Sequence, residues 1–260
     1  MNKKITSRSG LVLLAVVAAL IMLTSPTTSS AGITIYKEGD KYVKVGGRIH
    51  LQYNNYEPEA MSATDDLFLR RFRPYIEMGL FSDFSAKFEW DMAKGSGDNE
   101  LSVQGAYVKY SGIEDLSVII GNYVFPFSRE VYTSSNNQQL VERTFVGDHN
   151  FGVPDMVLGL HLKGSFMDKK LELMASYASA AVDPLSKKLD IESPVNSDSD
   201  FNEGWIYGVR VDYHPLGNLK MSQGDFDREL KATVSLALEG WENDGDNNTN
   251  TLLGSDTSIG

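Results

Sequence analysis

The sequence predicts an all-β fold, a transmembrane antiparallel β-barrel, and two observations support this fold class. About nine segments after residue 31 alternate apolar and polar residues, the pattern of strands with one apolar and one polar face. The connections between them alternate between short and long, as the turns and loops at the two ends of a membrane barrel do. A large secreted β-sandwich would also alternate. Apolar faces that end in Tyr, Trp and Phe, opposite charged faces on strand after strand, favour the membrane barrel.

The first 31 residues are predicted to be a secretory signal peptide. Three basic residues precede Leu11–Leu23, an unbroken run of 13 apolar residues, and Ser29–Ala31 offers small residues for cleavage. The run is shorter than the roughly 20 residues that a membrane-spanning helix needs, and a retained anchor is the alternative interpretation. We therefore expect residues 32–260 to be exported and to form part of a barrel in outer-membrane lipid of a Gram-negative bacterium.

The first predicted strand, Lys41–Tyr56, has the most regular alternation. Val45 and Ile49 lie on its apolar parity, whereas Arg48 and His50 lie on its polar parity. A period of two over this length indicates a strand with one face toward an apolar environment and one toward water.

The second predicted strand, Phe68–Leu80, follows the same rule. Phe68 and Phe72 are expected on its apolar face, and Arg71 is expected on its polar face. Arg70 falls on the apolar parity, which is unusual for a charged residue.

Seven further strands show the same period of two. They are predicted over Ser85–Met92, Val103–Tyr110, Leu116–Tyr123, Met156–Phe166, Leu171–Ser179, Trp205–His214 and Leu230–Trp241. Short connections are expected after Leu80, Tyr110, Phe166 and His214. Long polar connections are expected over residues 57–66, 93–100, 124–155, 181–203 and from residue 243 onward.

One connection is too long for a tight turn. The segment Gly121–Phe145 replaces the alternation with about twenty residues rich in Pro, Ser, Asn and Gln, and it leads to Glu142 and Arg143. In a barrel with a water-filled lumen, we expect residues 124–155 to fold inward and narrow the pore.

The composition excludes several classes of function. The net charge is −11; without residues 1–31, 21 basic and 35 acidic residues leave −14, which argues against a nucleic-acid partner. The absence of cysteine excludes disulfides and thiolate metal sites, and we expect no metal or other cofactor. Thr251–Gly260 is expected to be a polar loop. With an odd strand count, this predicts that the chain is the N-terminal part of a longer one.

A series of short motifs resembles one family. The chain reads V-G-G-R-I at 45–49, R-R-F-R at 70–73, G-A-Y-V-K-Y at 105–110, G-N-Y-V-F-P-F-S-R-E at 121–130, T-S-S at 133–135, E-R at 142–143 and F-G-V-P-D at 151–155. In this order and spacing the motifs resemble the phosphate-selective porin O and P family. The resemblance implies a 16-stranded, usually trimeric outer-membrane porin whose third loop folds into the lumen.

The resemblance also implies an anion site at the constriction. The matching residues are Arg48, Arg70, Arg71, Ser134, Ser135 and Arg143. Guanidinium groups offer forked donors for phosphate, and serine hydroxyls replace water on its remaining oxygens. Each residue has an alternative role: solvated wall charges for Arg48 and Arg71, a side chain at the membrane interface for Arg70, an ion pair with Glu142 for Arg143, and ordinary loop hydroxyls for the two serines.

The lumen charges are mixed. Gly105, Val124 and Val131 are neutral where the family tends to carry charge. Further lumen-side cations are expected at Lys44, Arg73 and Lys163, and offsetting acids at Glu77, Glu89, Asp91 and Asp212. The resemblance therefore supports the architecture better than the choice of phosphate.

The leading functional hypothesis is a porin for passive diffusion of small hydrophilic solutes, with an anion preference. A plugged structural or adhesion barrel is one alternative. An outer-membrane barrel enzyme is another, disfavoured because the four histidines are scattered and no Gly-x-Ser-x-Gly elbow occurs.

Overall fold

The computed structural model describes residues 32–56, 64–93, 102–140, 143, 156–179, 204–223, 228–243 and 254–259. The predicted signal peptide, Glu142 and residues 144–155 of the predicted infolded loop lie outside these ranges. No helix within the described ranges is both long enough and apolar enough to cross a membrane.

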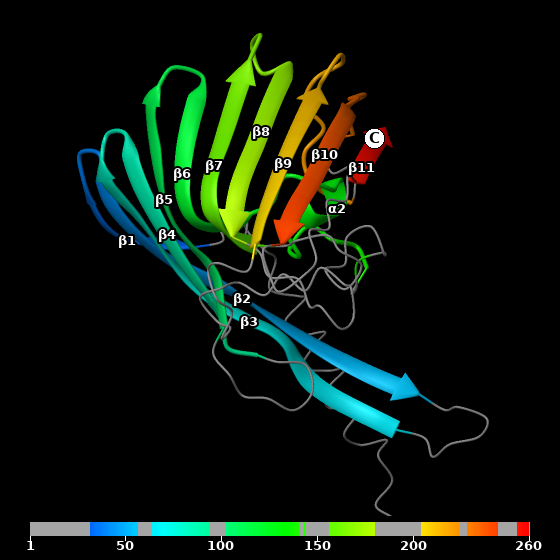
Figure 1. The fold of residues 1–260 in the computed structure, drawn as a ribbon. Helices are drawn as coiled ribbons and strands as arrows, with labels where there is room; N and C mark the ends of the chain where they lie inside the picture. Colours follow the sequence, from blue (N-terminus) through cyan, green and yellow to red (C-terminus); the bar gives the residue numbers. More distant parts are fainter. Residues whose placement is uncertain are drawn as a thin grey trace, which may run out of the picture. The chain divides into compact units, whose positions relative to one another are not determined.

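The described strands form one antiparallel sheet in which every strand pairs with its neighbours in the sequence (Figure 1). This arrangement confirms the all-β fold class. The strands are β1 Ile33–Glu38, β2 Lys41–Tyr56, β3 Thr64–Phe81, β4 Phe84–Asp91, β5 Ser102–Ile113, β6 Leu116–Val124, β7 Met156–Phe166, β8 Leu171–Ser179, β9 Gly204–Tyr213, β10 Val234–Asn243 and β11 Gly254–Ile259.

The structure contains all nine predicted strands and adds β1 and β11. β1 joins β2 through a two-residue turn in which Gly39 has a φ of +57°, a conformation that glycine adopts without strain. The expectation of a loop over Thr251–Gly260 was wrong, because β11 pairs with β10 from Glu239↔Gly254 to Val234↔Ile259. A polar segment can join a sheet in this way because the ladder uses backbone groups.

The two faces of the sheet differ in chemistry. We call the face that carries Arg48, Glu89 and Arg210 the inner face, because a connecting segment packs on it, and the opposite face the outer face. Large apolar side chains are exposed on the outer face, among them Leu51 at 69% and Leu236 at 52%. Apolar residues on one face and charged residues on the other are typical of membrane-barrel strands.

A β-bulge corrects one predicted face. His50 pairs with Arg71 and Leu51 pairs with Leu69, so Arg70 is an extra residue in β3. Each bulge shifts the alternation by one residue. Phe68 therefore lies opposite Gln52 on the inner face, and its predicted place beside Phe72 was wrong.

The connections at one end of the sheet are short with one exception. Residues 39–40, 82–83, 114–115 and 167–170 form the short turns. The β9–β10 connection covers residues 214–233, so the expectation of a short turn after His214 was wrong. Strand β10 begins at Val234, so Leu230, which was predicted to start it, lies outside the sheet; its side chain is 85% exposed.

Candidate functional site

The segment that follows β6 comes after a strand that contains a glycine with a positive φ. Gly121 has a φ of +131°, and a Cβ there would lie 2.1 Å from the Ala106 carbonyl oxygen, so the close approach of β5 requires glycine. A short helix, α2 Arg129–Tyr132, follows. Ser128 caps it by accepting a hydrogen bond from the Val131 backbone nitrogen at 3.1 Å.

This segment packs on the inner face of the sheet through a small apolar core. Phe125, Phe127 and Val131 are buried against four residues from four successive strands. These four are Val157 of β7, Ala178 of β8, Ile206 of β9 and Ala237 of β10. Apolar burial therefore draws the segment onto the same face as the charged residues.

Gly208 of β9 leaves room for the Phe125 ring. A Cβ at Gly208 would lie 2.4 Å from Phe125 Cζ, too close for two carbon atoms. The missing side chain creates the space in which Phe125, itself fully buried, sits.

A buried ion pair lies under the segment. Arg210 Nη1 donates to the Phe127 carbonyl oxygen at 2.5 Å, and its guanidinium contacts the Asp212 carboxylate at 2.9 and 3.1 Å. Both side chains are fully buried. A buried charge is tolerated when it is paired and hydrogen-bonded, and here the pairing also holds the backbone at Phe127.

Two side chains of helix α2 have pKa values that differ from their ordinary values. Burial, followed by repulsion from Arg210, lowers the pKa of Arg129. Burial raises the pKa of Tyr132 well above its ordinary value, so its hydroxyl stays neutral.

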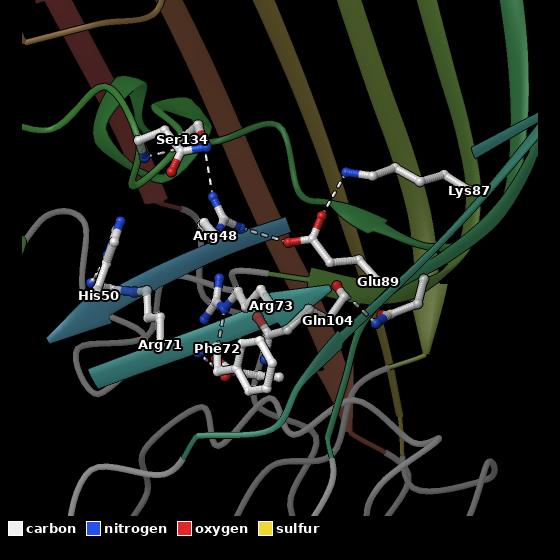
Figure 2. Close-up of polar contacts among 12 residues, drawn as sticks. Arg48, His50, Arg71, Phe72, Arg73, Lys87, Glu89, Gln104 and Ser134 are labelled. Atoms are coloured by element: carbon white, nitrogen blue, oxygen red, sulfur yellow. Dashed lines mark hydrogen bonds and ion pairs between the residues drawn. The ribbon is translucent and has the colours of Figure 1, made fainter. Parts of the chain in front are cut away.

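Arg48 of β2 links the segment to the opposite part of the sheet (Figure 2). Its Nη1 donates to Ser134 Oγ at 3.0 Å, and its Nη2 contacts Glu89 Oε1 at 2.6 Å. Lys87 Nζ contacts the other oxygen of the same carboxylate at 2.6 Å. One carboxylate on β4 therefore binds two cations beside a serine of the segment.

More cations lie next to Arg48 on β2 and β3. Arg48 pairs across the strands with Arg73, and His50 pairs with Arg71. Arg73 Nε donates to Asp91 Oδ2 at 2.6 Å, and Arg71 Nη1 lies 3.5 Å from His50 Nδ1. Like charges opposite each other in a sheet repel, so the neighbouring carboxylates reduce the cost of this arrangement.

A cavity of about 210 Å³ lies between the sheet and the segment. We call it the constriction cavity. It is lined by Arg48, Arg73, Lys87, Glu89, Gln104, Gly105, Tyr107, Tyr123, Val124, Val131, Tyr132, Ser134, Ser135, Arg143 and Met156. Within the described part of the chain, cations, hydroxyls and the carboxylate of Glu89 surround a space large enough for a small solute.

The model of the family described as phosphate-selective porin O and P matches residues 43–258. The chain belongs to this family. It is therefore a porin, a channel protein of the outer membrane. A search of curated proteins finds no match to the chain.

The porin brings four of the six residues predicted for the anion site into the constriction cavity. These are Arg48, Ser134, Ser135 and Arg143. Arg71 is 7% exposed and lies on the inner face beside His50, outside the cavity lining. Arg70 is the bulge residue of β3.

The neutral residues noted in the sequence have different surroundings in the porin. Val131 is only 3% exposed and packs in the apolar core, so its neutrality has a structural reason. Gly105 faces the cavity directly opposite Glu89 in the β4–β5 pair. The carboxylate of Glu89 therefore lies next to a position that has no side chain.

Sequence reasoning missed several residues that shape this region of the porin. It did not single out Lys87, or Arg210 with its contact to Phe127. The sequence did carry a signal for this packing: several residues of β7–β10 on the polar parity are apolar. An apolar residue on a water-facing surface indicates that another apolar group covers it.

A second cavity, of about 410 Å³, lies on the porin between β5, β6 and β7. Its polar lining includes Lys109, Lys163, Ser111, Ser117 and Ser165. The inner face therefore carries cations and hydroxyls at two separate places.

Proposed function

We propose that this porin allows passive diffusion of small hydrophilic solutes and favours anions, including phosphate. The observation that carries the proposal is the contact between Arg48 and Ser134, residues 86 positions apart, at the wall of the constriction cavity. Arg73, Lys87 and Arg143 line the same cavity, so among the described residues of its lining the cations outnumber the one carboxylate, Glu89.

The proposed anion ligands are those that the sequence pointed to. They are Arg48, Arg70, Arg71, Ser134, Ser135 and Arg143. Arginine forks and serine hydroxyls fit the oxygens of phosphate and other small oxyanions. The Ser135 hydroxyl is buried and has no hydrogen-bond partner within the described residues, so it is available to a solute in the cavity.

Nearby carboxylates keep this proposed site weak. Glu89 contacts both Arg48 and Lys87, and Asp91 contacts Arg73, all at 2.6 Å. A channel must release its solute as well as attract it. Partial neutralisation of the arginines fits a diffusion pore with a moderate anion preference.

Further parts of the proposal rest on the family. We propose that residues 124–155 form the constriction loop, that residues 1–31 are a cleaved signal, and that the complete protein is a homotrimer in outer-membrane lipid. The packing of Phe125 and Phe127 on the inner face supports the first of these.

The test is conductance of the complete protein in planar bilayers. Under a potassium chloride gradient we expect the reversal potential to be shifted toward the equilibrium potential of chloride. We also expect added phosphate to reduce the chloride current. Strong cation selectivity would refute the anion preference, and closed channels in every insertion would refute diffusion.

A plugged structural barrel is the second candidate. Arg210 and Asp212 are fully buried, so this part of the inner face is filled rather than wet. By contrast, the Arg48 and Lys87 side chains are 15% and 27% exposed, which favours a water path along β2 and β4. Absence of conductance in correctly folded protein would support the plugged barrel.

A further inference from the structure

The β9–β10 connection differs from all other described connections at its end of the sheet. It covers residues 214–233, whereas the other four contain two to four residues each. His214 N donates to the Lys170 carbonyl oxygen at 2.8 Å, so the connection starts beside the β7–β8 turn. A connection much longer than a turn, at the end where turns are short, suggests a specific role.

The described part of this connection runs along the inner face. Asn218 Nδ2 donates to Glu172 Oε1 of β8 at 2.9 Å, and Leu219 N donates to Thr233 Oγ1 at 3.3 Å. Glu172 pairs across the strands with Asp212, whose buried carboxylate faces inward. The connection therefore turns under the sheet rather than away from it.

The connection then meets the segment that carries α2. Arg129 Nη2 donates to the Lys220 carbonyl oxygen at 2.5 Å, and Asn137 Nδ2 donates to the Met221 carbonyl oxygen at 3.5 Å. These contacts join residues 84 or more positions apart. The two segments come from opposite ends of the sheet, since β6 and β9 end at opposite ends.

Gln223 makes the densest set of contacts. Its Oε1 accepts hydrogen bonds from Gln139 N at 2.6 Å and Leu140 N at 3.4 Å, and its Nε2 donates to Glu130 Oε1 at 3.4 Å. Its backbone nitrogen donates to the Asn137 carbonyl oxygen at 3.0 Å. One side chain thus uses both ends of its amide on the same segment.

These contacts surround the residues that form the constriction cavity. Glu130 and Gln139 lie on either side of Ser134 and Ser135 in the chain, and both serines line the cavity. Holding the segment on both sides of the serines limits where their hydroxyls lie relative to Arg48.

We propose that the β9–β10 connection folds into the lumen and clasps the segment that carries α2, and that Gln223 is a positioning residue that sets the width of the constriction. This inference rests on the proposed diffusion function. It adds a second lumen element, held to the first by the Gln223 amide.

The chain contains no cysteine, so the clasp can be tested with one introduced disulfide. A disulfide needs Cα atoms about 4.4–6.8 Å apart, a separation typical of residues joined by a backbone hydrogen bond. In the complete protein carrying Asn137→Cys and Gln223→Cys, we expect a high yield of this disulfide, detected by mass spectrometry. Folded protein that forms no disulfide under oxidation would overturn the clasp.

Single-channel recording tests the positioning role. Gln223→Ala removes the amide contacts, and we expect the time spent at a larger current level to rise about tenfold, the effect of losing about 1.4 kcal/mol. The reduced double-cysteine variant should behave in the same way, and its oxidised form should restore the wild-type current. Gln138→Ala is the matched control, because among the described residues Gln138 Nε2 donates to Thr133 O, which belongs to its own segment.

The outcomes separate this inference from the proposed function. Wild-type protein without conductance would refute diffusion, while the disulfide yield would still decide the clasp. Conducting wild-type protein with identical currents in Gln223→Ala and Gln138→Ala would refute the positioning role alone.

Discussion

Replacing Glu89 by glutamine should strengthen anion binding at the constriction. The change keeps the size of the side chain and an acceptor for Arg48, but it removes the charge that Arg48 and Lys87 both contact at 2.6 Å. The two cations then act on the solute without the opposing carboxylate.

The size of the effect follows from the geometry of the contacts. Arg48 Nη2 lies 2.6 Å from Glu89 Oε1. A phosphate oxygen bound to the same guanidinium would add about 2.8 Å, so the anion would sit about 5 Å from the carboxylate. Two unit charges at this distance in a water-like dielectric repel by about 0.8 kcal/mol. Removing this repulsion corresponds to roughly fourfold tighter binding.

The assay is phosphate block of the chloride current through the complete protein in planar bilayers. The phosphate concentration that halves the current should fall about fourfold in Glu89→Gln, and the effect should shrink in high salt because of screening. Glu114→Gln, in the exposed β5–β6 turn, is the matched control and should behave as wild type. An unchanged or higher blocking concentration in Glu89→Gln would refute the reasoning.

Three further changes test other contacts. Arg48→Lys keeps the positive charge but loses the forked guanidinium that contacts both Ser134 and Glu89. Phosphate should therefore block the chloride current less strongly, while the reversal potential keeps its sign. Phosphate block as strong as in the wild type would contradict this. Gly208→Val puts a branched side chain where even a Cβ would lie 2.4 Å from the Phe125 ring. The segment that carries Phe125 should be displaced, and the single-channel conductance should rise. A conductance equal to that of the wild type would contradict this displacement. Arg210→Ala leaves the Asp212 carboxylate buried without its cation and should lower the free energy of unfolding by about 3–5 kcal/mol, measured by urea titration; an unchanged midpoint would count against the buried pair.

The alternation of residues was sufficient to find nine strands, because in a barrel each parity reports directly on its surroundings. It was insufficient at the bulge in β3, since an extra residue such as Arg70 changes the face of Phe68 without changing the composition. It also failed at β11, where the polar segment Gly254–Ile259 joins the sheet by pairing with β10.

The residues of the candidate site were recognisable from motifs, but their grouping was not. Arg48 and Ser134 contact each other across 86 positions, and Arg71 lies outside the cavity that four of its predicted companions line. Which residues meet in space depends on the strand register and on the position of the connecting segment. A local sequence pattern predicts neither of these.

The sequence by itself determined the all-β class, the positions of most strands, the family and the set of cations on the polar parity. Only the tertiary structure decided where the segment that carries α2 lies and what holds it. Val157, Ala178, Ile206 and Ala237 are unremarkable one by one, yet strand pairing aligns them into one apolar patch that buries Phe125 and Phe127. The same pairing brings Glu89 to Arg48, so the register of the sheet, rather than any single motif, sets the charge at the wall of the cavity.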